Sequence, residues 1–562
     1  MEFDAVLLEP RRARMEAEGF WPGRTLLDYF EACLAEKPDA LALVSVVAAT
    51  GARRALTYAE IDRLAWRAAA GLRRLGLGRN DVLSSQLPNG WEFIVLYIAC
   101  RRLGVVFNPV MPIFREHELR FMLRHGEARA FVVPRVFRGF DHAAMAEALK
   151  AELPDLRHVI VAGDGGPSGF ETLLLDGALD AEVEAARAAS ARDRGDANDV
   201  CQLIYTSGTT GEPKGVMHTA NTMYSNLVAY AARLGLGAAD VVLMASPMAH
   251  QTGFMYGFLL PVMLKAPMVL MDSWDKALAA RLIAQEGVTF TMASTPFLMD
   301  LADTVEAQGT GTPTLRIFLC AGTAIPGALV ERAHRVLGTR IVSAWGMTEN
   351  GAVTVVPPSE PDVRSVETDG LALPGMELQI RAADGTVLPA GREGALYVRG
   401  CSNFVGYLKR PQWNATDAEG WFDTGDIARM DEAGYIRICG RTKDVIIRGA
   451  ENLPVVEIEA VLYRHPAVQQ VAIVAYPDPR LGERACAFVV PKEGKSFSFE
   501  EMVRFLDSQQ LARQYYPERL EVRDQLPSTA SGKIQKFALR TLLREALENP
   551  RNENPRNENP RP

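Results

Sequence analysis

The chain has 562 residues, with 61 Lys and Arg against 69 Asp and Glu, and therefore a formal net charge of −8. Apolar residues make up 48 % of it, enough to bury a core, so disorder of the whole chain is excluded. Because the chain is acidic and has no dense Lys/Arg block, we expect no nucleic-acid partner. The seven cysteines are scattered, without a Cys-x-x-Cys pair, which argues against a disulfide scaffold or a zinc ribbon. This cysteine usage and a poor signal sequence predict a cytoplasmic protein.

The amino-terminal part of the chain combines a helical pattern over 58–75 with an apolar run over 92–102. From residue 200 onward, short apolar runs alternate with helical segments. Strands and helices that alternate in this way predict an α/β fold of mostly parallel sheets with both faces covered. The runs are 200–205, 241–244, 268–271, 288–292, 316–320 and 340–343, and the helical segments are 221–234, 275–285 and 327–337.

One stretch, residues 241–264, raises the question of a membrane span because it carries no charge. Pro247, Gly253, Gly257 and Pro261 interrupt it, whereas a spanning helix is predominantly apolar over about 20 residues. We therefore expect a buried strand, a loop and a second apolar element here, and no membrane span.

The pattern changes after residue 374. Residues 376–398 predict a strand, a turn and a strand, and so a β-rich subdomain over about 375–440. A compact α+β unit follows, with helices over 457–465, 500–508 and 537–547 and strands over 468–475 and 484–491. We expect a large domain over 1–440, a small mobile domain over 441–547 and a disordered tail over 548–562, whose Glu-Asn-Pro-Arg repeats cannot build a core.

The strongest local pattern is YTSGTTGEPKG at residues 205–215, between an apolar strand and a helical segment. Hydroxyls and glycines together allow backbone and side-chain donors to surround phosphate oxygens, and Lys214 adds a positive charge. The segment is not a Walker A loop, because Pro213 precedes the lysine and Gly215 follows it. The pattern predicts a phosphate-binding loop of another kind.

Four further motifs follow in order: WGMTE at 345–349, WFDTGD at 421–426, GRTKD at 440–444 and PSTASGK at 527–533. With residues 206–214, they resemble the signatures of the adenylate-forming superfamily, which includes acyl-CoA synthetases, peptide-synthetase adenylation domains and luciferases. The resemblance covers about residues 25–547. It implies that a carboxylate attacks the α-phosphate of ATP, with Mg²⁺, to give acyl-adenylate and pyrophosphate. The thiol of coenzyme A then attacks the acyl carbonyl and releases AMP.

The resemblance also implies which segments hold the nucleotide: the phosphate loop, the turn after the strand 316–320, the aromatic motif and an acidic residue suited to ribose hydroxyls. The residues so assigned are Thr206, Ser207, Gly208, Thr209, Thr210, Gly211, Lys214, Gly322, Thr323, Ala324, Trp345, Gly346, Met347, Asp426, Ile436 and Arg441.

Catalytic roles follow from the same resemblance. Glu349 is the implied Mg²⁺ ligand, and Thr348 beside it is placed to donate to a phosphate oxygen. Lys533 matches a mobile lysine that bridges the carboxylate and the α-phosphate during adenylation only, and Lys443 matches a hinge position. His250 is implied at the mouth of the acyl pocket, where a neutral imidazole can hydrogen-bond the carboxylate; a satisfied core histidine is the alternative.

The segment around Arg448, Gly449 and Ala450 matches the loop that lines the coenzyme A tunnel. Many relatives carry two glycines where this chain has Gly449 and Ala450. The additional Cβ disfavours a positive φ and narrows a tunnel, so the coenzyme A half-reaction is the step that this departure affects.

The expected acyl pocket includes His250, Gly253, Phe254 and Met347, and the segments that form it carry no charged side chain before Glu349. This composition favours an apolar carboxylic acid. Residues 3–8 and 443–457 resemble cyclohexanecarboxylate–CoA ligases and related medium-chain ligases, and cyclohexanecarboxylate is therefore the predicted acid. Linear medium-chain and aryl acids remain alternatives.

Two other functional classes stay open from the sequence. One is an adenylating enzyme whose acceptor is not coenzyme A, and the other is a non-catalytic nucleotide-binding protein whose tail docks a partner. The sequence also leaves homo-oligomer formation open.

Overall fold

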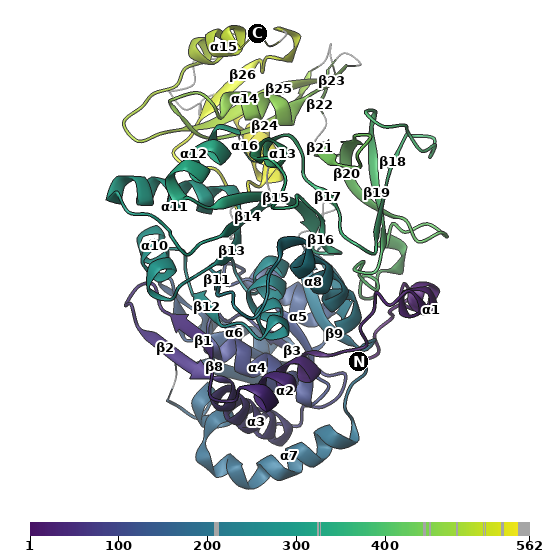
Figure 1. The fold of residues 1–562 in the computed structure, drawn as a ribbon. Helices are drawn as coiled ribbons and strands as arrows, with labels where there is room; N and C mark the ends of the chain where they lie inside the picture. The colour runs from purple at the N-terminus through teal and green to yellow at the C-terminus, as the bar shows by residue number, and fades with distance from the viewer. Residues whose placement is uncertain are drawn as a thin grey trace.

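The computed structural model describes residues 1–163, 165–206, 213–322, 325, 327–441, 446–448, 451–478, 482–509, 511, 513–529 and 533–548. Two large sheets form the lower part of the molecule in Figure 1. The first has six strands in the order β10-β9-β4-β3-β5-β8 and is parallel except for the antiparallel pair β9–β10. Its strands are β3 (Val82–Ser85), β4 (Val106–Pro109), β5 (Ala128–Pro134), β8 (His158–Ala162), β9 (Val200–Thr206) and β10 (Lys214–Thr219).

The second sheet has nine strands in the order β17-β16-β15-β14-β13-β11-β12-β1-β2. Its six central strands are parallel, and β2, β16 and β17 pair antiparallel at the two edges. The strands are β1 (Leu41–Val46), β2 (Arg53–Thr57), β11 (Val242–Met244), β12 (Met268–Met271), β13 (Phe290–Ala293), β14 (Ile317–Ala321), β15 (Arg340–Met347), β16 (Gly351–Val355) and β17 (Leu371–Ala372).

One hydrophobic core joins the two sheets. Eleven of the twelve residues of α4, all but Glu92, are buried, which is typical of a helix enclosed on almost all sides, and α4 shares this core with α8 and η3. Along the nine-stranded sheet, Val242 and Met244 face this core, whereas Leu243 faces a second core under α10, α11 and α12. Both faces of the sheet are therefore covered, as the continuous apolar runs predict.

Several helices of the large part begin at recognisable caps. Thr57, for example, caps α3 through a capping box with Glu60. The helical elements are α1 (Glu9–Ala17), α2 (Leu26–Glu36), α3 (Tyr58–Arg74), α4 (Trp91–Arg102), α5 (Glu116–His125), α6 (His142–Glu152), η1 (Glu171–Leu175), η2 (Gly177–Leu179), α7 (Asp180–Arg192), α8 (Ala220–Leu234), η3 (Thr252–Leu259), α9 (Leu260–Leu264), α10 (Lys276–Gln285), α11 (Thr295–Gln308), α12 (Gly327–Leu337) and α13 (Asp362–Glu367).

A four-stranded antiparallel sheet, β18-β19-β20-β21, forms the expected β-rich part. Its strands are β18 (Met376–Arg381), β19 (Glu393–Gly400), β20 (Phe422–Met430) and β21 (Ile436–Arg441).

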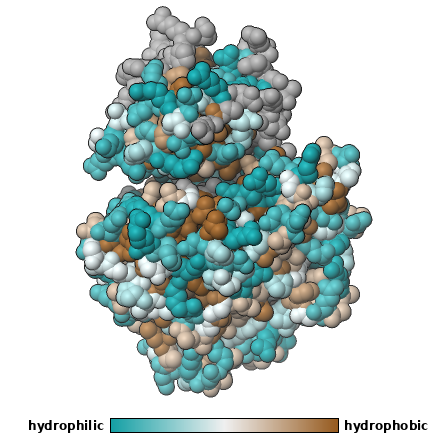
Figure 2. Space-filling view, turned by 45° about the horizontal axis from the view of Figure 1, so that its top comes forward, coloured by the Kyte–Doolittle hydropathy of each residue, from teal (hydrophilic) through white to brown (hydrophobic). Residues whose placement is uncertain are grey.

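The carboxyl-terminal unit has its own five-stranded sheet and its own hydrophobic clusters, and it lies at the top of Figure 1. Figure 2 shows a furrow between this upper unit and the rest of the molecule. The elements are β22 (Ile446–Arg448), β23 (Glu451–Leu453), α14 (Val455–Leu462), β24 (Val468–Asp478), β25 (Gly482–Pro491), α15 (Phe499–Ser508), β26 (Arg519–Val522) and α16 (Lys536–Glu548).

The predicted fold class is confirmed, and some element ends shift. The strand expected over 288–292 begins only at Phe290, because Gly287 at φ +65° and Val288 close the end of α10. The helix expected over 457–465 runs from Val455 to Leu462, directly after Pro454. The predicted tail beyond residue 548 lies outside the described residues. The predicted domain boundary at 440/441 lies at the end of a described range, because residues 442–445 are outside the described residues. The described helices include none that is long and apolar enough to cross a membrane.

Candidate active site

The expected phosphate loop connects β9 to β10. Thr206, the last residue of β9, pairs with Lys214, the first residue of β10, so the two ends of the loop are held side by side. The Nζ atom of Lys214 lies 4.7 Å from the ring centroid of Tyr407 and 5.6 Å from that of Trp413. Two aromatic faces therefore hold a positive charge at the base of the loop.

A tight turn between β15 and β16 carries Thr348 and Glu349. A Cβ at Gly346 would lie 1.9 Å from the carbonyl oxygen of Gly351, and Gly351 itself has φ +65°. Within the turn, the Asn350 amide oxygen accepts from the Met347 backbone N–H at 3.1 Å. Two glycines and a side-chain-to-backbone bond thus specify this turn.

Three contacts reach the turn from other parts of the chain. The Tyr407 hydroxyl donates to Glu349 Oε1 at 2.7 Å, and the Phe404 backbone N–H donates to the Glu349 carbonyl at 2.6 Å. His218 Nε2 donates to the Thr348 carbonyl at 2.8 Å. Burial raises the pKa of Tyr407, with a further contribution from Glu349, and burial lowers the pKa of His218 to about 4. At neutral pH both groups are therefore neutral and both donate.

The donor set around Glu349 fits a Mg²⁺ ion that takes most of its ligands from phosphate oxygens and water. Glu349 is only 6 % exposed, and Tyr407 occupies one carboxylate oxygen. No partner for Oε2 is found within the described part of the chain. That same part holds no group of three or more His, Cys, Asp or Glu residues that could bind a metal without the nucleotide.

Near the same end of β15, just before the turn, the structure brings three predicted nucleotide residues together. The Trp345 indole N–H donates to Asp426 Oδ2 at 3.0 Å, and Arg441 Nε donates to Asp426 Oδ1 at 2.8 Å. The Asp426 side chain is 4 % exposed. Each carboxylate oxygen has a second lone pair, so the group keeps acceptor capacity for hydroxyls. Ile436 is buried in β21, beside the strand that carries Asp426.

His250 and Lys533 come from different units of the molecule, and the positive charge of Lys533 acts on the His250 imidazole. His250 lies in the turn before η3, where its Nδ1 accepts from the Thr252 backbone N–H at 3.2 Å. Burial, and then the charge of Lys533, lower the pKa of His250 to about 4. Lys533 lies in a small turn in which its backbone N–H donates to Thr529 Oγ1 at 3.0 Å, and its side chain is exposed.

The residues expected in the acyl pocket have different surroundings. A Cβ at Gly253 would lie 2.3 Å from the Pro247 carbonyl oxygen, so this glycine allows a close backbone approach. Phe254 is fully buried, and its ring centroid lies 4.9 Å from that of Tyr97 in the core. Met347 is partly buried and packs against a small hydrophobic cluster that contains Phe404 and Tyr407. Gly253 and Phe254 lie on η3 and Met347 ends β15, and their shared pocket stays a prediction.

Other predicted residues have structural partners or lie outside the described residues. Arg448 Nη1 donates to the Tyr516 carbonyl at 3.3 Å and also pairs with Glu518. Gly322 follows β14 with φ +92°. The predicted residues outside the described part are Ser207, Gly208, Thr209, Thr210, Gly211, Thr323, Ala324, Lys443, Gly449 and Ala450.

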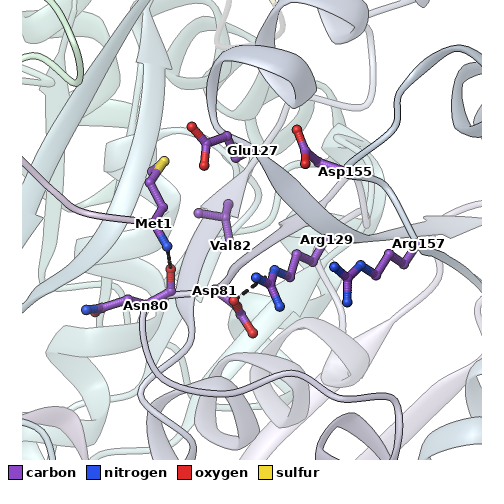
Figure 3. Close-up of a pocket in the computed structure, with 8 residues that line it drawn as sticks. All are labelled: Met1, Asn80, Asp81, Val82, Glu127, Arg129, Asp155 and Arg157. Atoms are coloured by element: carbon purple, nitrogen blue, oxygen red, sulfur yellow. Dashed lines mark hydrogen bonds and ion pairs between the residues drawn. The ribbon is translucent and has the colours of Figure 1, made fainter.

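A small cavity of about 60 Å³ is drawn in Figure 3, and none of the predicted site residues lines it. An ion pair between Arg129 and Asp81 at 2.9 Å forms part of its wall. We assign it no part in the reaction.

Sequence reasoning missed Tyr407 and His218. His218 is four residues after Lys214 in one strand, and side chains at even spacing share a face, so this alternation was an available signal. Nothing near Tyr407 in the sequence points to Glu349, because only the fold brings the two residues together.

Comparison with known proteins agrees with this geometry. The AMP-binding enzyme family matches residues 30–408, and the AMP-binding enzyme C-terminal domain matches residues 457–533. A medium-chain fatty-acid–CoA ligase of Escherichia coli (strain K12) is 37 % identical over 96 % of this chain and 94 % of its own length. A salicylyl-CoA synthase / salicylate adenylyltransferase of a Streptomyces species is 34 % identical over 94 % and 96 %. The crystal structure of ATP-bound MatB from Rhodopseudomonas palustris has a TM-score of 0.79 at 27 % identity, over 92 % of this chain and 99 % of its own.

The chain therefore belongs to the AMP-binding enzyme family. Within that family it is an AMP-forming acid–CoA ligase, which uses ATP to join a carboxylic acid to a thiol.

Proposed function

We propose that the enzyme activates a linear medium-chain fatty acid. The observation that carries this proposal is the 37 % identity to a medium-chain fatty-acid–CoA ligase over nearly the whole of both chains. The apolar composition of the expected pocket segments supports it. The comparisons do not support the sequence-based prediction of cyclohexanecarboxylate, which we keep only as a member of the substrate panel below. An aryl acid is the second candidate, favoured by the 34 % identity to the salicylyl-CoA synthase.

In the proposed adenylation step, a substrate carboxylate oxygen attacks the α-phosphorus and the bond to pyrophosphate breaks. The chemistry gathers anionic oxygens around one phosphorus, so it needs cations and oriented donors more than acids or bases. We assign these roles to Lys214 at the base of the phosphate loop, to Thr348, and to Lys533 from the small unit. Glu349 would hold Mg²⁺, which supplies charge neutralisation to the phosphates when bound.

The nucleoside end is proposed to rest on Trp345 and Asp426. Asp426 would accept from ribose hydroxyls through its remaining lone pairs, while Trp345 and Arg441 keep the carboxylate in place. The Trp345 ring would lie against the adenine. Because Trp345 and Asp426 are already hydrogen-bonded to each other, the site is preorganised, and less conformational entropy is lost when the nucleotide binds.

The proposed role of His250 depends on its protonation state. A pKa of about 4 keeps the imidazole neutral at pH 7, and because Nδ1 accepts a backbone N–H, the proton lies on Nε2. A neutral Nε2–H is a donor that can orient a substrate carboxylate. Lys443, Arg448, Gly449 and Ala450 keep their proposed hinge and coenzyme A roles.

The test is AMP formation from ATP with octanoate, salicylate, cyclohexanecarboxylate and butyrate, each with and without coenzyme A. We expect a coenzyme A-dependent rate that is greatest for octanoate. A greatest rate for salicylate would move the assignment to an aryl acid. Equal AMP release without coenzyme A would indicate another acceptor, and no AMP with any acid would overturn the proposed substrate class.

A further inference from the structure

The carboxylate of Glu349 is held in one orientation by a side chain from a distant segment. Tyr407 donates to Oε1 at 2.7 Å, and its ring packs with Phe404 and Phe422 in a small buried cluster. The phenol is 3 % exposed, so it does not exchange this bond for water easily. Since Tyr407 uses one oxygen, the carboxylate can rotate little, and the second oxygen is the one left for a cation.

The backbone of the same turn is held from the other side. His218, which is 1 % exposed, donates from Nε2 to the carbonyl of Thr348 at 2.8 Å. A carbonyl can only accept, so this imidazole carries its proton on Nε2. The second ring nitrogen, Nδ1, lies 3.0 Å from Thr222 Oγ1, which fixes the plane of the ring.

Both contacts depend on β10. Its outer edge pairs with the segment that carries Tyr407, through Met217 N to the Gly406 carbonyl at 3.1 Å and Leu408 N to the Gly215 carbonyl at 2.8 Å. Lys214 and His218 lie on one face of this strand because they are four residues apart. One strand thus presents the lysine of the phosphate loop, supports Tyr407 and positions the Thr348 carbonyl.

We propose that Tyr407 and His218 are positioning residues for adenylation, which hold the Thr348–Glu349 turn on β10 so that one oxygen of Glu349 points to the metal–nucleotide complex at a set distance from Lys214. The proposal rests on the proposed role of Glu349 as metal ligand. It goes further by naming two residues that need not touch any substrate.

The first test uses Tyr407→Phe, which keeps the ring in its cluster and removes only the hydroxyl. The readout is binding of Mn²⁺, as a spectroscopic probe, to the protein with α,β-methylene-ATP, measured by electron paramagnetic resonance. A hydrogen bond to a charged group corresponds to about a tenfold change in an equilibrium constant. We expect Mn²⁺ binding to weaken by about tenfold, whereas binding of the nucleotide without metal is unchanged.

Tyr58→Phe is the matched control, because it also removes a buried hydroxyl, one that faces the Ala266 carbonyl at 3.4 Å in the core. A merely structural role for Tyr407 would make the two variants alike: a lower melting temperature and unchanged Mn²⁺ binding. That result would overturn the proposal.

The second test compares His218→Gln with His218→Leu. The glutamine amide can still donate to the Thr348 carbonyl, whereas leucine cannot. We expect the Mg²⁺ concentration that gives half-maximal ATP–pyrophosphate exchange to rise about tenfold in the leucine variant and to be largely restored in the glutamine variant. His142→Leu controls for the loss of a buried histidine elsewhere. Equal Mg²⁺ midpoints in the two His218 variants would contradict a positioning role.

Glu349→Gln separates this proposal from the one it rests on. If Glu349→Gln retains Mn²⁺ binding, the metal role of Glu349 is wrong. If Glu349→Gln loses Mn²⁺ and Tyr407→Phe does not, Glu349 binds the metal and only the positioning role fails. Should Tyr407→Phe not fold, the His218 pair decides the outcome.

Discussion

At the scale of single residues, the site consists of side chains whose chemistry is set by the groups that face them. Asp426 accepts from an indole and a guanidinium, Glu349 accepts from a phenol, and His250 is neutral because it is buried and near Lys533. Apart from Asp426 and Arg441, which face each other on the neighbouring strands β20 and β21, these pairs join residues that are far apart in the sequence. Their individual substitutions therefore test the geometry directly.

Asp426→Asn replaces one acceptor oxygen by an amide NH₂ group, which can only donate and which then faces the N–H donor of Trp345 or Arg441. Because either Trp345 or Arg441 then loses its partner, and the proposed ribose contact weakens, we expect AMP to bind about 10- to 100-fold less tightly by titration calorimetry. Asp423→Asn is the control, since Asp423 accepts a local turn N–H, that of Gly425, at 2.9 Å. Equal AMP affinity in the two variants would exclude Asp426 from the nucleotide site.

Lys533→Ala tests whether Lys533 acts in adenylation but not in the coenzyme A half-reaction. We expect pyrophosphate exchange to fall by at least about 100-fold, because one positive charge leaves the reacting phosphate, while coenzyme A still reacts with supplied acyl-adenylate. Lys536→Ala, which removes a lysine paired with Glu459 at 2.7 Å in the same unit, should leave exchange unchanged. Loss of both half-reactions in Lys533→Ala would contradict the assignment.

At the scale of elements, two segments determine where the Thr348–Glu349 turn lies. β10 links the phosphate loop to the 404–408 segment by backbone hydrogen bonds. The amino-terminal segment covers the same region from outside: the buried guanidinium of Arg11 donates to the carbonyls of Gly400, Asn403 and Phe404. Burial lowers the pKa of Arg11 to about 10, so the group remains charged at neutral pH.

Arg11→Met should destabilise the protein by about 2–4 kcal/mol in the free energy of unfolding, since three carbonyls in partly buried hydrogen bonds lose their donor. Urea unfolding gives this value. Arg12→Met, one residue along α1 and exposed, serves as the comparison and should change stability little. If both variants unfold at the same urea concentration, the buried contacts of Arg11 carry no net stability.

Gly346→Ala tests the turn between β15 and β16. A methyl group 1.9 Å from the Gly351 carbonyl oxygen forces one of the two strands to move. We expect a loss of about 2–4 kcal/mol in the free energy of unfolding and loss of pyrophosphate exchange in the folded fraction. Gly311→Ala, where a Cβ would meet no atom within 4 Å, should leave both the stability and the exchange rate close to those of the parent protein.

At the scale of the whole molecule, four partly or fully buried histidines link stability to pH. Burial is the first cause that lowers the pKa of His125, His142, His218 and His250, in each case to about 4. An unfolded histidine has a pKa of about 6.5, so the unfolded chain binds more protons between these two values. The associated stability is therefore complete above about pH 6.5 and is lost as the pH falls toward 4.

We expect the free energy of unfolding, measured in urea, to fall steeply between pH 6.5 and pH 4.5. His142→Leu should make that dependence shallower, because one group that titrates only on unfolding is gone; a fully buried neutral histidine contributes at most about 3 kcal/mol over this range. A pH dependence unchanged by this substitution would mean that His142 is already accessible to protons in the folded protein.

The local features of this protein follow from the order of its residues. Apolar runs and helical periodicity predicted most elements after residue 200 to within a few positions, because the strand and helix periods are properties of short segments. The glycine- and hydroxyl-rich segment 205–215 indicated phosphate chemistry for the same reason: the chemistry lies in neighbouring residues.

The tertiary structure alone decided which distant side chains meet. Tyr407 reaches Glu349, His218 reaches Thr348, Trp345 reaches Asp426, and Lys533 comes near His250 only after sheets from separate stretches of chain pack together. Strand order and register determine such contacts, and a pattern of apolar residues specifies which face of a strand is buried but not which strand lies beside it. Phe254 likewise packs with Tyr97 from a separate stretch of chain, in the core between the sheets.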